Sequence, residues 1–111
     1  MDDEEDYINA CQLRQDSRKN LINRINEASV VISSNLATIR LLRINMKQTH
    51  INKMTLHFLS NTERVGDHAI NLLSASNLVE KIAEATIDEL LKAISTKEKL
   101  LKELTAELNS L

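Results

Sequence analysis

The feature that most restricts the fold of this chain is the near absence of residues that interrupt a helix. The 111 residues contain no proline and one glycine, and only Tyr7 and Phe58 are aromatic. Strands favour aromatic and β-branched residues and need turn residues between them, whereas leucine, alanine, lysine and glutamate favour helices. The sequence therefore predicts an all-α protein, and its length predicts one domain, residues 1–111.

Apolar residues recur at steps of three and four, the spacing of one helix face, in three stretches. The first covers about residues 4–47, and its stripe comprises Leu21, Ile22, Ile25, Ala28, Ile32, Leu36, Ile39 and Met46. The second covers about residues 50–76, with an inner stripe of Ile51, Met54, Phe58, Val65, Ala69, Leu72 and Leu73. The third covers about residues 78–109, with Ile82, Ile87, Leu90, Leu91, Ile94, Leu101, Leu104 and Leu108.

Polar residues mark the two expected connections between these helices. Thr49 is suited to cap the second helix, because its side-chain oxygen accepts a free N–H group of a first turn. Residues 74–77 form the other turn-prone cluster. A further cap at Asp16 and Ser17 would divide the first stretch. Short connections make neighbouring helices antiparallel, so we expect an up-down-up three-helix bundle of long antiparallel helices.

Charge and cysteine content exclude several classes of protein. Lys and Arg number 14 and Asp and Glu 16, for a net charge of −2, which argues against a nucleic-acid partner. The single cysteine, Cys11, cannot form an intrachain disulfide and is expected to pack as a small apolar residue in a reducing compartment. No apolar run approaches the ~20 residues that span a bilayer, and no signal peptide is recognisable. We therefore expect a cytoplasmic protein.

The most distinctive segment is residues 61–71, which contains Glu63, Asp67 and the only glycine, Gly66. On a helix, residues four apart share a face, with Cβ atoms about 6 Å apart, so two carboxylates repel unless a cation lies between them. A glycine inside a helix costs roughly 1 kcal/mol relative to alanine, which indicates a packing or functional reason. The alternative is an ordinary solvated face on which Arg64 pairs with Asp67.

The order of residues in SNTERVGDHAINLL, residues 60–73, closely resembles the signature of the PhoU family. This family comprises phosphate-uptake regulators and the PhoU-like domains fused to sodium–phosphate cotransporters. The resemblance covers about residues 56–73. The matching positions are Asn61, Glu63, Arg64, Val65, Gly66, Asp67, His68, Ala69, Ile70 and Asn71.

The resemblance implies a PhoU-like three-helix bundle that binds iron or other metal ions through paired Glu/Asp-x-x-x-Asp motifs on adjacent helices. Glu63 and Asp67 would then form one half of a metal site. Arg64, His68 and Asn71 match family positions that would support the ligands without binding the metal directly.

The second half of such a site departs from the family pattern. The first helix offers only Glu27, and the other acidic pair, Glu84 and Asp88, follows the signature instead of preceding it. With turns near residues 48 and 77, a helical rise of about 1.5 Å per residue brings Glu27, Asp67 and Asp88 to similar heights. The candidate ligands of a divalent or iron ion are therefore Glu63, Asp67, Asp88, Glu27 and Glu84. Lys92 could instead neutralise Glu63.

Other polar groups suggest weaker alternatives. His50, His57 and His68 lack the spacing of a zinc or di-iron site, so surface positions are expected. A cationic group near the first expected turn could bind phosphate or an anionic membrane, or simply be the solvated end of a helix. Its members are Arg40, Arg43, Lys47, His50 and Lys53. No arrangement typical of a catalytic nucleophile is recognisable, so we do not expect an enzyme.

Taken together, these features predict a PhoU-like regulatory domain of a phosphate-transport system. More narrowly, they predict the cytoplasmic domain of a sodium–phosphate cotransporter-related protein. Its partners would be a membrane phosphate transporter or its own membrane domain, and a second copy in a homodimer. The alternatives are a metal-free helical interaction module and a standalone PhoU regulator with a single repeat.

Overall fold

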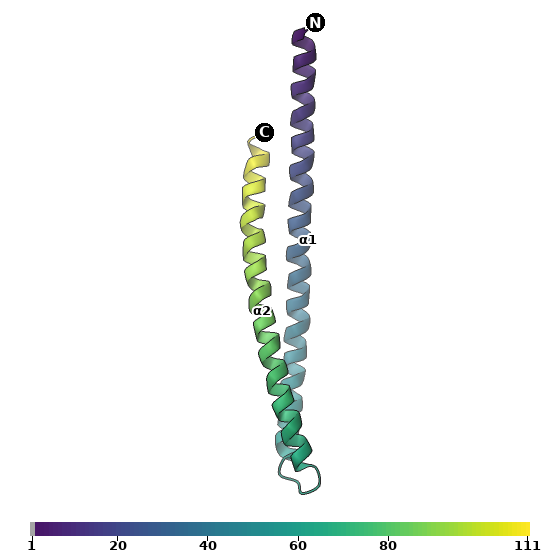
Figure 1. Cartoon of the computed structure of the whole chain (residues 1–111), viewed down its shortest axis with the longest axis vertical. Helices are drawn as coiled ribbons and strands as arrows, with labels where there is room; N and C mark the ends of the chain where they lie inside the picture. Colours follow the sequence, from purple (N-terminus) through teal and green to yellow (C-terminus); the bar gives the residue numbers. More distant parts are fainter. Residues whose placement is uncertain (1) are drawn as a thin grey trace. The chain divides into compact units, whose positions relative to one another are not determined.

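Long runs without proline or glycine let helical hydrogen bonding continue over many turns, and this chain forms two such runs. The computed structural model describes residues 2–111. Helix α1 covers Asp2–Leu59, helix α2 covers Gly66–Asn109, and residues 60–65 connect them (Figure 1). The all-α prediction is confirmed. The prediction of three helices is wrong for the described residues, which form two.

Neither expected connection is a turn, because the polar residues there are accommodated inside helices. The Thr49 hydroxyl donates to the Asn45 carbonyl oxygen at 2.9 Å, the bond to residue i−4 that threonine makes in a helix interior. Asp16 likewise accepts a bond from the Gln12 amide at 3.0 Å within α1. Residues 74–77 lie inside α2, between leucine-rich turns. The caps predicted at Thr49 and at Asp16 and Ser17, and the connection predicted at residues 74–77, are therefore wrong.

The chain reverses direction at Ser60–Val65, inside the segment with the PhoU-like signature. The Ser60 and Thr62 hydroxyls donate to the carbonyl oxygens of His57 and Leu59, at 2.6 and 2.7 Å. The last carbonyl groups of a helix lack partners within the helix, and these bonds supply partners at the end of α1. The Leu59 carbonyl oxygen also accepts the backbone N–H of Thr62 at 3.0 Å. The backbone N–H of Gly66 donates to the Thr62 carbonyl oxygen at 3.0 Å, which joins the turn to α2.

Glycine is required at position 66 because there is no room for a side chain, and not because the backbone has an unusual φ angle. Its φ is not positive, and it is buried at the start of α2. A Cβ atom at this position would lie 2.8 Å from the backbone carbonyl oxygen of Ser60, closer than real Cβ atoms approach an oxygen. The only glycine of the chain therefore lets the end of α1 pass close to the start of α2.

Packing divides the chain into two compact units. The turn unit is Asn35–Lys92, and the terminal unit combines Met1–Ser34 with Ala93–Leu111. In the turn unit, the less exposed positions alternate by steps of three and four on both helices, the pattern of coiled-coil packing. On α1 they are Asn35, Ile39, Leu42, Met46, Thr49, Lys53 and Leu56. On α2 they are Gly66, Ala69, Leu73, Ser76, Glu80, Ala83, Ile87 and Leu90.

The seam of the turn unit, defined by these positions, contains an ion pair. The Lys53 ammonium lies 2.9 Å from a Glu80 carboxylate oxygen, and the two side chains are 18% and 22% exposed. Both residues occupy positions where an apolar side chain would be usual. The pair links α1 to α2 at one level, which fixes the register of the two helices within this unit.

The terminal unit has the same kind of packing over a shorter length. Leu21 and Ala28 of α1 and Ile94 and Leu104 of α2 are buried, with 2–6% of their surface exposed. The first turns of α1 have no part of α2 beside them (Figure 1). Cys11 is half-buried there, and three apolar side chains in this part of α1 are exposed: Tyr7, Ile8 and Leu13.

Candidate functional site

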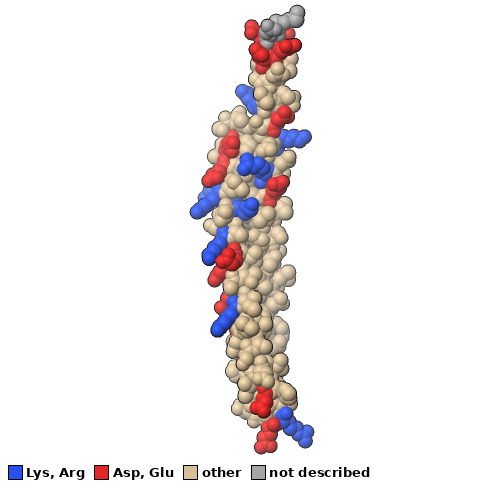
Figure 2. All heavy atoms as spheres, viewed as in Figure 1, with Lys and Arg blue, Asp and Glu red and all other residues tan. Residues whose placement is uncertain are grey.

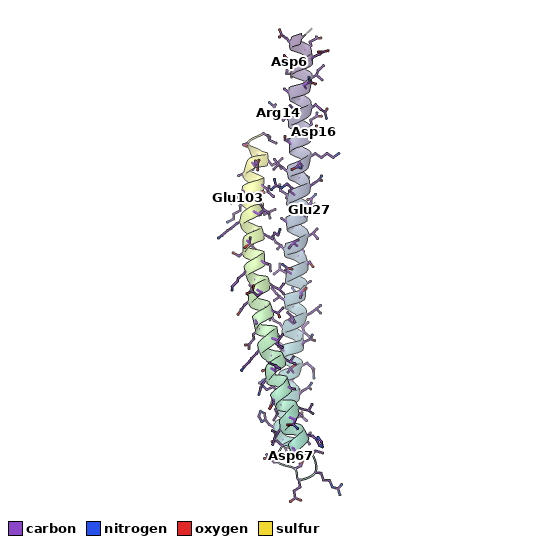
Figure 3. The ribbon with its side chains drawn as sticks, in the orientation of Figure 1. Asp6, Arg14, Asp16, Glu27, Asp67 and Glu103 are labelled. Carbon is purple, nitrogen blue, oxygen red and sulfur yellow. The ribbon has the colours of Figure 1, made fainter. Side chains whose placement is uncertain are left out.

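The signature residues lie at and just after the turn. Glu63 and Arg64 belong to the connection, and Asp67 is the second residue of α2 (Figure 3). All three are exposed, as are His68 and Asn71 on the first turns of α2. Because Glu63 precedes the helix, the expectation that Glu63 and Asp67 share one helix face is wrong. Among the described residues, Arg64 and Asp67 form no ion pair.

The position of Asp67 has a sufficient structural explanation. It lies in the first turn of α2, where unpaired backbone N–H groups and the helix dipole favour a negative charge. An aspartate at this place stabilises the start of a helix without any ligand. The conspicuous carboxylate of the motif is therefore accounted for by the turn itself.

The other candidate ligands do not gather around Asp67. Asp88 lies in the same helix, about 30 Å further along its axis at ~1.5 Å per residue. Asp67 and Asp88 were expected at similar heights on two antiparallel helices. This prediction is wrong, because no turn occurs near residue 77. Glu84 and Asp88 do share a face of α2, both exposed, while Glu27 is exposed on the terminal unit. Among the side chains that the structure describes, no three of His, Cys, Asp or Glu form a potential metal site.

Lys92, which could have neutralised Glu63, lies elsewhere. Its ammonium is 3.4 Å from a Glu89 carboxylate oxygen, and both side chains are about three-quarters exposed. Glu63 precedes α2, and Lys92 lies about 40 Å along that helix from the turn. The predicted pairing is therefore wrong, whereas metal binding by the acidic residues stays a prediction from the resemblance.

A shallow groove of about 540 Å³ runs along one flank of the turn unit. It combines two basic side chains of α1 with two carboxylates of α2, so its charge is mixed. Apolar side chains of α1 complete the wall. The lining residues are Met46, Lys47, His50, Ile51, Glu80 and Glu84. His50 therefore lines the same groove as two carboxylates, an arrangement that the sequence did not predict.

The turn unit also has a row of exposed apolar side chains on α1. We call it the outer stripe, because its positions lie opposite the seam around the helix. The exposed fractions are 57–75%. The members are Leu41, Ile44, Ile51, Met54 and Phe58.

The outer stripe corrects part of the predicted core. Ile51, Met54 and Phe58 were expected on the inner stripe of a second helix, but they are 57%, 64% and 75% exposed. α1 has apolar residues on two opposite faces, and α2 covers only one of them. Periodicity shows both faces but not which of them a single neighbouring helix will cover.

Charge is distributed unevenly around the outer stripe. No acidic residue occurs between Glu27 and Glu63, whereas Arg40, Arg43 and Lys47 lie beside or near the stripe. Residues 54–62 and 68–79 carry no Asp, Glu, Lys or Arg at all. Figure 2 shows the corresponding uncharged surface before the turn, with charged side chains again at the turn itself. The turn unit therefore combines a large uncharged surface with a cationic flank on α1.

Within residues 2–111, neither helix has a stretch long and apolar enough to cross a bilayer. The outer stripe indicates a surface suited to contact with another helix.

Comparisons with protein-family models, with curated proteins and with solved structures found no match to this chain.

Proposed function

We propose that this chain is a regulatory, non-catalytic interaction module of a phosphate-transport system, related to PhoU and acting on the cytoplasmic side of the membrane. The resemblance of residues 60–73 to the PhoU signature supports the biological context. The exposed apolar surface of the turn unit supports interaction as the mode of action. Its partner would be a membrane phosphate transporter or the membrane domain of a cotransporter-type protein.

The outer stripe is the observation that carries this proposal. Fully burying one large apolar side chain contributes about 1.5–3 kcal/mol, so covering five side chains that are 57–75% exposed would contribute roughly 5–10 kcal/mol before the costs of association. A surface of this size in water is a liability unless something covers it. Contact with another helix recovers that free energy, whereas catalysis has no comparable support among the described residues.

The outer stripe also offers a place for a third helix. A helix packed there would contact α1 on the face away from the seam, so the three helices would form a row with α1 in its middle. The signature would then act mainly as a tight turn, with Gly66 and the hydroxyls of Ser60 and Thr62 closing it.

Phosphate uptake tests the proposal. Cells of the source organism that lack this chain should take up radiolabelled phosphate at an altered rate, and the intact chain should restore it. The Ile51→Gln/Phe58→Gln variant should accumulate normally but fail to restore the rate, because its outer stripe is polar. A matched Leu78→Gln/Ile82→Gln variant changes exposed residues of α2 and should restore it. Unchanged uptake in cells without the chain would refute the proposed role.

A further inference from the structure

We infer that the outer stripe binds an acidic amphipathic helix of a partner protein. This inference rests on the proposed function as an interaction module and adds the chemistry of the partner. It concerns the face of α1 that α2 leaves exposed. The flank of basic residues and the narrow width of the stripe carry it.

The width of the stripe suits a helix better than a membrane surface. Four of the five members, Leu41, Ile44, Ile51 and Phe58, fall on positions that continue as steps of three and four through the polar residues Gln48 and Thr55. Met54 lies on the flank, seven residues after Lys47. Such a stripe, with two positions per seven residues, is the narrow seam of a coiled coil. A helix lying in a membrane surface needs a broader apolar face with cations on both sides. Here the second flank consists of neutral side chains such as Asn45 and Asn52.

The basic residues beside the stripe favour a partner helix with negatively charged side chains. Arg40 and Lys47 are exposed, lie seven residues apart and border the stripe on one side. Glu84 lines the groove together with Lys47, while Arg40 lies outside that groove. No acidic residue of α1 lies between positions 28 and 62. Carboxylates of an incoming helix would meet these cations at the edge of the seam, the position where charged pairs set partner choice in coiled coils.

A second copy of α1 is disfavoured by the same charges. Antiparallel packing of two outer stripes about their midpoint, near residue 49, would bring Lys47 of the two copies close together on the same edge of the contact. Like charges at such an edge oppose association. A helix with carboxylates at its flanking positions removes this repulsion and satisfies both cations.

The available area is sufficient for a specific, reversible contact. Each of the five side chains offers on the order of 100 Å² of apolar surface, so the stripe offers roughly 500 Å². Neighbouring polar positions on the same face would add to this. A standard interface buries about 800 Å² on each partner, so the contact would be of modest to standard size.

Two synthetic helical peptides with the same leucine stripe test the inference on the full chain. One has glutamate at the flanking positions and the other lysine. We expect the glutamate peptide to bind with a micromolar Kd by isothermal titration calorimetry, and the lysine peptide to bind at least tenfold more weakly. Ile44→Gln/Ile51→Gln should weaken glutamate-peptide binding at least tenfold. The matched Leu78→Gln/Ile82→Gln variant should change it less than threefold.

A charge-reversal variant tests directly whether Arg40 and Lys47 determine the preference for an acidic peptide. Arg40→Glu/Lys47→Glu should invert the preference, so that the lysine peptide binds more tightly. Circular dichroism checks that every variant keeps its helices. Equal affinity for both peptides, or full binding by the Ile44→Gln/Ile51→Gln variant, would overturn the inference. Binding to phosphatidylglycerol vesicles in place of the peptide would overturn it in favour of a membrane surface.

Self-association is the remaining alternative. If sedimentation shows a dimer that Ile44→Gln/Ile51→Gln dissociates, a second copy covers the stripe and the inference is wrong. These outcomes are separable from the proposed function, because the phosphate-uptake experiment does not depend on the charge of the partner.

Discussion

The ion pair between Lys53 and Glu80 offers a direct test of how the two helices of the turn unit are held together. The perturbation is a pair of substitutions, Lys53→Leu and Glu80→Leu, made singly and together. Each single variant leaves one charge in the seam without its partner. The double variant replaces the pair by two apolar side chains of the kind that surround it.

The structure sets the magnitude of each effect. The two charged atoms are 2.9 Å apart, and the side chains are only 18% and 22% exposed. Removing one partner of a fully buried pair costs about 3–5 kcal/mol, and partial exposure reduces this to roughly 2–3 kcal/mol for Glu80→Leu. Replacing both partners is often neutral or stabilising. We therefore expect the free energy of unfolding of the double variant to be at most about 1 kcal/mol below that of the parent chain, and it can exceed it.

Urea unfolding followed by circular dichroism at one fixed protein concentration measures these values, and a double-mutant cycle isolates the coupling energy. The exposed pair of Lys92 and Glu89 serves as the control, since Glu89→Gln there should change stability by less than about 0.5 kcal/mol. A Glu80→Leu variant as stable as the double variant would refute the reasoning. It would mean that Lys53 reaches water as easily as a surface lysine does.

Three further predictions concern the turn, the terminal unit and metal. Gly66→Ala should lower the free energy of unfolding in urea by about 1–2 kcal/mol, because the added Cβ would lie 2.8 Å from the Ser60 carbonyl oxygen. A gain in stability would contradict the close approach of the Ser60 backbone to Gly66. Leu104→Ala should cost about 2–4 kcal/mol by the same assay, since Leu104 is 2% exposed, and a cost below 1 kcal/mol would show that the terminal unit is loosely packed. EDTA should leave the thermal midpoint unchanged, because the described residues assemble no three donors. A rise in midpoint on adding iron or manganese, absent in Glu63→Ala/Asp67→Ala, would instead support the site implied by the resemblance.

The helical class and much of the seam could be predicted from the sequence because they depend on local properties. Absence of proline and steps of three and four residues indicated helices, and Leu21, Ala28 and Ile39 were correctly placed on an inner stripe. Ala69 is also buried as expected.

The position of the turn could not be predicted by the same reasoning. Thr49 has the side chain of a helix cap, but a threonine hydroxyl also bonds within a helix, and residue type alone does not distinguish the two. The useful signal was the polar run of Ser60, Asn61 and Thr62 just before the only glycine. Treating Gly66 as a glycine inside a helix concealed that signal. It also placed Glu63 on a helix to which it does not belong.

The small side chains of the seam have a consequence for how this protein would respond to its partner. Gly66, Ala69, Ser76 and Ala83 bury little apolar area each, so the helix pair of the turn unit has a modest free energy of folding of its own. A ligand that binds only the folded state adds RT ln(1 + [L]/Kd), about 2.7 kcal/mol at a hundredfold excess over Kd. The thermal midpoint of this unit would therefore rise with the logarithm of the partner concentration once that concentration exceeds Kd. By thermodynamic linkage, the folded fraction of the helix pair would then depend on whether the partner is bound.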